Sequence, residues 1–196
     1  MINFTEKYQL SATHSEIVEA AKRITPGHAL DLGCGNGRNA LYLNQLGFNV
    51  TAWDKNPQSI ARLNYIIAQE ALNNIVTDVK DLDAYRFNGA YDFVFSTVVM
   101  MFLQPDTIPQ MIADMQASTV KDGFNLIVAA MDTPDHPCRL PFLFTFKSGE
   151  LSHYYRKWHI VKYNENVGQL HKVDENGNRI SLRFATLLAQ KSSIKA

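Results

Sequence analysis

Three glycines at alternate positions, Gly33, Gly35 and Gly37, separate an apolar run from a helical one. The apolar run before them predicts a strand, and the spacing of residues 39–46 predicts a helix. Glycines between a strand and a helix let the backbone turn sharply and approach a ligand closely. A carboxylate, Asp54, follows the first glycine by about 20 residues, at the end of the next apolar run. This order predicts a βαβ unit in which the acid meets a ribose diol.

The spacing of the glycines separates two classes of nucleotide site. Dinucleotide-binding loops follow G-x-G-x-x-G, whereas this chain has Asp31-x-Gly33-x-Gly35-x-Gly37. That spacing disfavours a nicotinamide dehydrogenase, and it resembles motif I of the class I S-adenosylmethionine-dependent methyltransferases. The resemblance implies S-adenosyl-L-methionine as the cofactor and S-adenosyl-L-homocysteine as its product. A glycine-rich turn without a ligand is the alternative, disfavoured because strand, loop, helix, strand and Asp54 fall in register.

Composition limits the partners of the chain. At 196 residues it has the length of one domain with a sizeable core, so we expect a single domain over residues 1–196, with residues 1–12 as a candidate lid. The 19 basic and 19 acidic residues cancel, which argues against a surface for nucleic acid or anionic membranes. Cys34 and Cys138 have no metal-ligand spacing, so we expect no metal site and a reducing cytoplasm. We find no apolar run of signal-peptide or membrane-spanning type.

Strand and helix patterns alternate up to residue 130, which predicts a mainly parallel sheet with helices on both faces. Thr13 and Glu16 form a capping-box pattern at the start of the first helix. Asn176-Gly177 predicts the turn of a closing β-hairpin. The expected fold is α/β and Rossmann-like, with a C-terminal antiparallel hairpin whose place in the sheet is implied by the resemblance. The remaining expected helices are 14–24, one from residue 57, 105–119 and 150–157, and the remaining strands are 75–79, 91–96, 123–130, 158–170 and 179–189.

Ligands of open α/β sheets bind beyond the carboxyl ends of the strands. The resemblance implies that Asp54 holds the ribose hydroxyls and that Arg38 pairs with the methionine carboxylate. It also implies that Asp81 accepts from the adenine amino group, beside a donating Leu82 backbone. Without the resemblance, Asp81 is as consistent with a solvated loop acid. The expected cofactor set is Asp31, Gly33, Gly35, Gly37, Arg38, Asn39, Asp54, Lys55, Asp81, Leu82, Ser96 and Val98.

The resemblance becomes narrower towards the C-terminus and extends over residues 4–190. The segments that are similar to the TehB family of tellurite-resistance methyltransferases are residues 8–10, 13–16, 96–103, 127–133, 161–165, 168–172 and 176–179. The C-terminal segments are more specific than the glycine loop, which many unrelated methyltransferases share. The resemblance implies methylation of tellurite, and of selenite by extension, as a detoxification.

A basic cluster, His171, Lys172 and Arg179, flanks the expected hairpin turn, and Arg183 follows with the same strand parity as Arg179. Tellurite has a lone pair on its chalcogen, so it needs cations that hold the oxyanion more than it needs a base. In TehB-type enzymes a histidine and two arginines are implicated at these positions, which implies catalytic roles for His171 and Arg179. Lys172 replaces an arginine, so the charge is kept and the bidentate fork is lost. The alternative to a catalytic role is that these basic residues form a solvent-exposed surface at the end of the hairpin.

Two other functions stay open. A methyltransferase of an organic small molecule or thiol would require a larger apolar pocket. A non-catalytic module would bind S-adenosyl-L-methionine as a sensor or partner subunit, without turnover. Methylation of nucleic acid is disfavoured, because the fourth strand does not end in an Asn-Pro-Pro-Tyr motif. The sequence at that place is Ser96-Thr97-Val98-Val99. We therefore expect a small-molecule or oxyanion substrate.

Overall fold

The structure is a computed structural model that describes residues 1–192, apart from the side chains of His171 and Lys172. Among these residues, the strands form one sheet in the order β3-β2-β1-β4-β5-β8-β6, and β7 pairs with β8. The strands are β1 (His28–Leu32), β2 (Asn49–Asp54), β3 (Ile75–Val79), β4 (Tyr91–Thr97), β5 (Thr119–Ala130), β6 (His159–Asn164), β7 (Val167–Val173) and β8 (Arg179–Gln190). The helices are α1 (Phe4–Tyr8), α2 (Ser15–Ala21), α3 (Arg38–Gln45), α4 (Pro57–Gln69), α5 (Thr107–Ser118) and α6 (Glu150–Tyr154), with a 3-10 turn η1 (Met100–Phe102).

The first five strands run parallel to one another. β1 pairs with β2 on one side and with β4 on the other, so the sheet grows from β1 toward β3 and then from β4 toward β5. The loops after β1 and β4 diverge at this switch of direction, which is where open α/β sheets bind their ligands. β8 runs antiparallel to β5, β6 and β7. The expected α/β fold with antiparallel C-terminal strands is confirmed.

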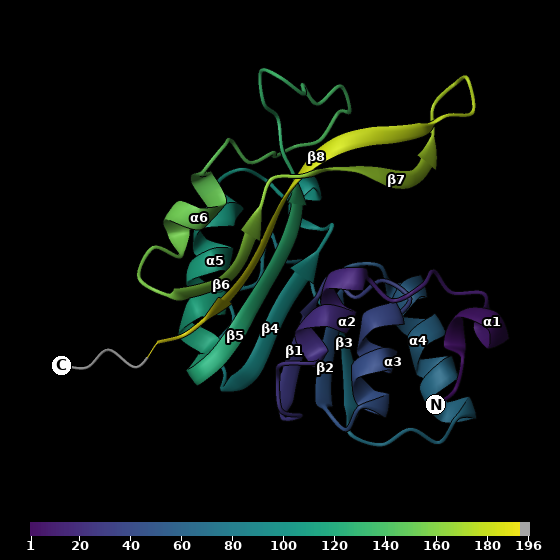
Figure 1. The fold of residues 1–196 in the computed structure, drawn as a ribbon. Helices are drawn as coiled ribbons and strands as arrows, with labels where there is room; N and C mark the ends of the chain where they lie inside the picture. Colours follow the sequence, from purple (N-terminus) through teal and green to yellow (C-terminus); the bar gives the residue numbers. More distant parts are fainter. Residues whose placement is uncertain (193–196) are drawn as a thin grey trace.

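Helices cover both faces of the sheet, with α1 to α4 on one side and α5 and α6 on the other (Figure 1). The core on the first side includes Ile17, Leu63 and Phe93, and the core on the second includes Met115 and Val94. Phe93 and Val94 are neighbours in β4 and enter opposite cores, because successive side chains of a strand point to opposite faces. A central strand buried on both faces is typical of a parallel sheet.

β7 and β8 form a hairpin that extends beyond the helical layers (Figure 1). In its turn, Asp174 Oδ1 accepts the N–H groups of Asn176 and Asn178, each at 2.9 Å. Gly177 has a φ of +80°, a value that favours glycine. The turn predicted from Asn176-Gly177 is confirmed.

The start of α2 differs from the prediction. His14, not Thr13, is the N-cap, and its Nδ1 accepts the Glu16 N–H at 3.2 Å. The Thr13 hydroxyl donates instead to the Arg38 carbonyl at 3.2 Å. The helix ends at Ala21, before the predicted residue 24. The segment before α2 is thus tied to the start of α3.

The strand expected over residues 158–170 is divided into β6 and β7. At the division, the Asn166 carbonyl accepts the Phe184 N–H at 2.9 Å. The Glu165 carboxylate accepts the Gly149 N–H at 2.7 Å. These two bonds hold a bend that redirects the chain into the hairpin. No helix within residues 1–192 has the length and apolarity to cross a membrane.

Candidate functional site

The glycine loop joins β1 to α3 at the switch point of the sheet. Gly33 donates its N–H to the Trp53 carbonyl at 2.8 Å, which fixes the loop to β2. Gly37 is the N-cap of α3 with a φ of +87°, and a Cβ there would lie 2.3 Å from Leu63 Cδ1. A Cβ on Gly35 would meet no atom within 4 Å. The loop is therefore packed at Gly37 and open at Gly35, where it lines a cavity of about 320 Å³.

Asp54 stands at the carboxyl end of β2. Its Oδ2 accepts the Gly35 N–H at 2.8 Å, and its Oδ1 accepts the Asn56 N–H at 2.8 Å. A carboxylate has about four lone-pair sites, so each oxygen retains capacity for a further donor. Asp54 lines a second cavity, of about 260 Å³, together with Lys55 and Leu82. The backbone thus holds this carboxylate in place with its free lone pairs beside the cavity.

Asp31 is the buried acid of the loop, with 1% of its surface exposed. Burial raises the pKa of its carboxyl to about 8, the Asp54 charge adds to the rise, and the Arg38 charge opposes it. Its Oδ2 has no hydrogen-bond partner among the described residues. Burial also raises the pKa of the Cys34 thiol, which keeps that thiol protonated. A cationic donor would complete the bonding of Asp31.

Val98 connects three cavities. It follows β4 with a φ of +61°, which is unusual for a β-branched residue and costs about 1–3 kcal/mol. Its N–H donates to the Val128 carbonyl at 2.7 Å. Val98 lines the cavities at the glycine loop and at Asp54, and also a third cavity of about 480 Å³. Strain of this kind concentrates at functional sites, and here it stands where the three cavities adjoin.

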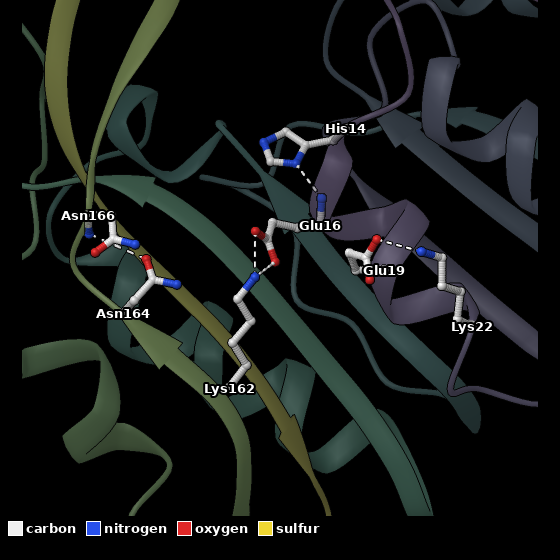
Figure 2. Close-up of polar contacts among 7 residues, drawn as sticks. All are labelled: His14, Glu16, Glu19, Lys22, Lys162, Asn164 and Asn166. Carbon is white, nitrogen blue, oxygen red and sulfur yellow. Dashed lines mark hydrogen bonds and ion pairs between the residues drawn. The ribbon is translucent and has the colours of Figure 1, made fainter.

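The third cavity lies between α2 and the strands β6 to β8. Arg38 lines both this cavity and the one at the glycine loop. Glu16 and Lys162 form an ion pair in its wall, at 2.6 Å (Figure 2). Sequence reasoning missed this pair, because Glu16 had a predicted capping role and no short-range pattern connects it to Lys162.

The described arginines of the predicted basic cluster, Arg179 and Arg183, do not line these cavities. Arg179 lines a separate cavity of about 940 Å³, together with His136, Arg139 and Ser181. Arg183 donates to the Asp135 carboxylate and to the Glu165 carbonyl. His171 and Lys172 belong to β7, and their side chains are outside the part of the chain that the structure describes.

The other predicted cofactor residues have mixed surroundings. Asn39 is buried, and its side chain joins the His14 N–H at 3.0 Å to the Thr97 hydroxyl at 3.0 Å. Ser96 is fully buried beneath the site. Asp81 is exposed and its Oδ1 accepts the Asp83 N–H at 3.0 Å.

Metal ligation has no visible basis among the described residues, in which no three His, Cys, Asp or Glu side chains are grouped to hold an ion. The groups at the joined cavities are instead carboxylates, guanidinium and ammonium groups, and backbone amides. Such groups suit a polar organic ligand with a cation, an anion and hydroxyls.

Comparison with known proteins identifies relatives over most of the chain. The model of the family described as "Tellurite resistance protein TehB" matches residues 2–188. A protein of Haemophilus influenzae (strain 10810), named "Probable S-adenosyl-L-methionine-dependent methyltransferase TehB", is 54% identical over 188 residues, 96% of this chain and 65% of that protein. A protein of Eikenella corrodens named "Hemagglutinin 1" is 47% identical over 188 residues, 96% of this chain and 62% of its own length.

A solved structure has the same fold. The crystal structure of TehB from Haemophilus influenzae is 53% identical, with a TM-score of 0.94, over 96% of this chain and 66% of that one. The chain thus spans about two thirds of the length of the relatives it matches. The family match covers nearly all described residues, including the glycine loop, Asp54 and the hairpin. The chain belongs to the TehB family.

Proposed function

We propose that this protein is an S-adenosyl-L-methionine-dependent methyltransferase that methylates tellurite, and selenite as its chemical analogue. The observation that carries the proposal is the family match over residues 2–188, which spans all three joined cavities. The names of two relatives, at 54% and 53% identity, include the same cofactor. The product would be S-adenosyl-L-homocysteine, and the methylated oxyanion would be the detoxified form.

The residues at the joined cavities fit this cofactor. Asp31 Oδ2, buried without a partner among the described residues, would accept from the ammonium group. Asp54, held by two backbone N–H groups, would accept from the ribose hydroxyls. Arg38, in the wall of the glycine-loop cavity, would pair with the carboxylate. Leu82 would pack at the adenine, with Asp81 beside it as acceptor for the amino group.

When bound, the cofactor supplies a methyl group activated by a sulfonium. The chain would then have to hold the acceptor in line with that methyl group and to exclude water. A tellurite lone pair would attack without loss of a proton, so cations that bind the oxyanion would do more than a general base. We assign this holding role to His171, Lys172 and Arg179 of the hairpin, which the resemblance implies, and Arg179 would have to reach the acceptor from the separate cavity that it lines.

Residues 1–196 would act as a single domain in which residues 1–12 close over the cofactor. Leu10 and Ser11 line the glycine-loop cavity, and the Ala12 carbonyl accepts from Arg38 Nη1 at 3.2 Å. A reducing cytoplasm suits Cys34 and Cys138, which are both free thiols.

The test combines turnover with binding. Protein, S-adenosyl-L-methionine and tellurite or selenite would be incubated together, and S-adenosyl-L-homocysteine would be measured. We expect release only when all components are present. Asp54→Ala should weaken cofactor binding by about 10-fold or more in calorimetric titration, because a charged acceptor is lost. Arg179→Ala should keep cofactor affinity and lower turnover, with the exposed Arg156→Ala as its control.

Two results would contradict the proposal. Unchanged affinity in Asp54→Ala would remove the cofactor assignment. Cofactor binding without S-adenosyl-L-homocysteine release from either oxyanion would remove the acceptor assignment.

One observation favours an organic acceptor as the second candidate. The cavity of about 480 Å³ has the size of a small-molecule pocket, and Val128, Leu170 and Phe184 contribute apolar wall. A non-catalytic module is the third candidate, and a relative at 47% identity has a name, "Hemagglutinin 1", that mentions no catalysis. Such a module would bind the cofactor and turn over no acceptor.

A further inference from the structure

The third cavity is placed to receive a methyl acceptor. It has about 480 Å³, and it adjoins the glycine-loop cavity at Arg38 and Val98. A molecule in it would lie beside whatever the glycine loop holds. Among its lining residues the charged side chains are Arg38, Glu16 and Lys162.

Glu16 and Lys162 point toward one another (Figure 2), and both line this cavity. Lys162 Nζ lies 2.7 Å from Glu16 Oε1 and 2.6 Å from Oε2. The Lys162 side chain is 41% exposed and the Glu16 side chain 19%. The lysine is therefore neutralised by a carboxylate and remains open to a solute.

A chain of hydrogen bonds positions Glu16. His14 Nδ1 accepts the Glu16 N–H, and the His14 N–H donates to Asn39 Oδ1 at 3.0 Å. Asn39 Nδ2 in turn donates to the Thr97 hydroxyl at 3.0 Å, at the end of β4. Glu16 is thereby positioned relative to the same strand end that carries Val98.

Lys162 owes its direction to a bulge in β6. Ile160 pairs with Ala189 and Lys162 with Leu188, so Val161 is an extra residue. Val161 packs against the core that contains α2, and the next side chain, Lys162, also reaches α2. Successive residues of a regular strand point to opposite faces, whereas a bulge re-aims a side chain.

We propose that Lys162 anchors the anionic group of the methyl acceptor, and that Glu16 is an internal counter-ion which the acceptor displaces. The inference rests on the proposed methyl transfer and specifies its acceptor side. An ammonium has three donors, which an incoming anion can take over from the carboxylate. Glu16 then sets the affinity for anions by competing with them.

This competition predicts opposite effects of the two partners. Glu16→Gln removes the competing charge, so an anion should bind about 5- to 10-fold more tightly. Lys162→Gln removes the anchor and leaves Glu16 to repel the anion, so binding should weaken by about 10-fold or more. An ion pair that only supports the fold would give losses of the same sign.

The measurement is calorimetric titration of selenite into the protein saturated with S-adenosyl-L-homocysteine. Glu19→Gln is the matched control, because Glu19 pairs with Lys22 at 2.6 Å on the same helix, outside the cavity lining, and acts on Lys162 only through its charge (Figure 2). It should change selenite affinity much less than Glu16→Gln does. Lys162→Arg keeps a cation and should restore most of the affinity, which separates loss of the anchor from loss of folding.

Opposite shifts in Glu16→Gln and Lys162→Gln support the inference, and equal shifts, or no binding of either selenite or mercaptoacetate by the parent, overturn it. Titration of mercaptoacetate in place of selenite tests an organic anion as the ligand. The probe that binds more tightly, in a way that depends on Lys162, shows whether the site prefers an oxyanion or an organic anion.

Turnover is measured separately from binding. Opposite shifts without tellurite turnover would remove the proposed function and keep the anchor. Tellurite turnover with an unchanged KM in Lys162→Gln would keep the function and remove the anchor.

Discussion

Asp31 is a carboxyl that folding removes from water at the end of β1. Burial raises its pKa to about 8 from an ordinary value of 3.8. Between these values the unfolded chain has released a proton that the folded chain still holds. The folded protein binds more protons, so its unfolding free energy falls as pH rises through this window, by at most about 1.4 kcal/mol per pH unit.

Asp31→Asn removes that titration. We expect the variant to gain stability relative to the parent as pH rises from about 5 to about 8. Urea unfolding of both proteins without cofactor, at a series of pH values in this range, measures the difference. A difference that stays constant over the range would contradict the burial of an uncompensated carboxyl. The same variant should bind cofactor less tightly, because an amide attracts an ammonium group less than a carboxylate does.

In the glycine loop, Gly37 is closely packed and Gly35 faces open space. Gly37→Ala forces a side chain into a φ of +87° and against Leu63, a core residue. We expect a loss of about 2–4 kcal/mol in unfolding free energy, from backbone strain and overpacking together. Thermal or urea unfolding measures it.

Gly35→Ala is the matched control in the same loop. Its Cβ meets no atom within 4 Å, so the stability loss should be about 1 kcal/mol, from the positive φ alone. The added methyl group would enter the cavity and weaken cofactor binding. Equal stability losses in the two variants would contradict this division of the loop, as would unchanged cofactor affinity in Gly35→Ala.

Regular elements are the part of the fold that local sequence predicts well. The strand expected over residues 75–79 matches β3 in its bounds, because a short segment rich in β-branched residues stands between Asn73-Asn74 and Asp81. The bend between β6 and β7 was missed, since it depends on Arg183, Phe184 and Gly149 bonding to a distant part of the chain. Tertiary bonds of that kind leave no periodic signal.

The candidate site divides in the same way. The glycine loop and Asp54 follow from spacing within one βαβ unit, and the structure places both at joined cavities. The pair Glu16–Lys162 spans 146 positions of sequence, and only the sheet order brings α2 beside β6. Arg179 is the opposite case. The sequence predicts its role in a basic cluster, but it does not predict that Arg179 lines a separate cavity.

At the scale of the whole molecule, α1 fastens the N-terminal segment across the helical layer. Glu70 of the α4 C-cap accepts from Lys7 at 2.6 Å and from the Tyr8 hydroxyl, which raises the Tyr8 pKa to about 12. Arg62 of α4 donates to the Tyr8 carbonyl at 2.7 Å. Leu10 and Ser11 then lie in the wall of the glycine-loop cavity. We expect these contacts with α4 to keep that wall in place.

Glu70→Ala releases Lys7 and Tyr8 together. We expect faster deuterium exchange in residues 3–12 and cofactor dissociation accelerated by about 10-fold, because residues 1–12, the proposed lid, lose two charge-assisted contacts. Exchange mass spectrometry and stopped-flow dissociation measure the two effects. Glu6→Ala is the control, since Glu6 is an exposed acid of α1 whose bonds to Asn3 are local. Faster exchange with unchanged dissociation would mean that the segment packs on α4 without closing over the cofactor.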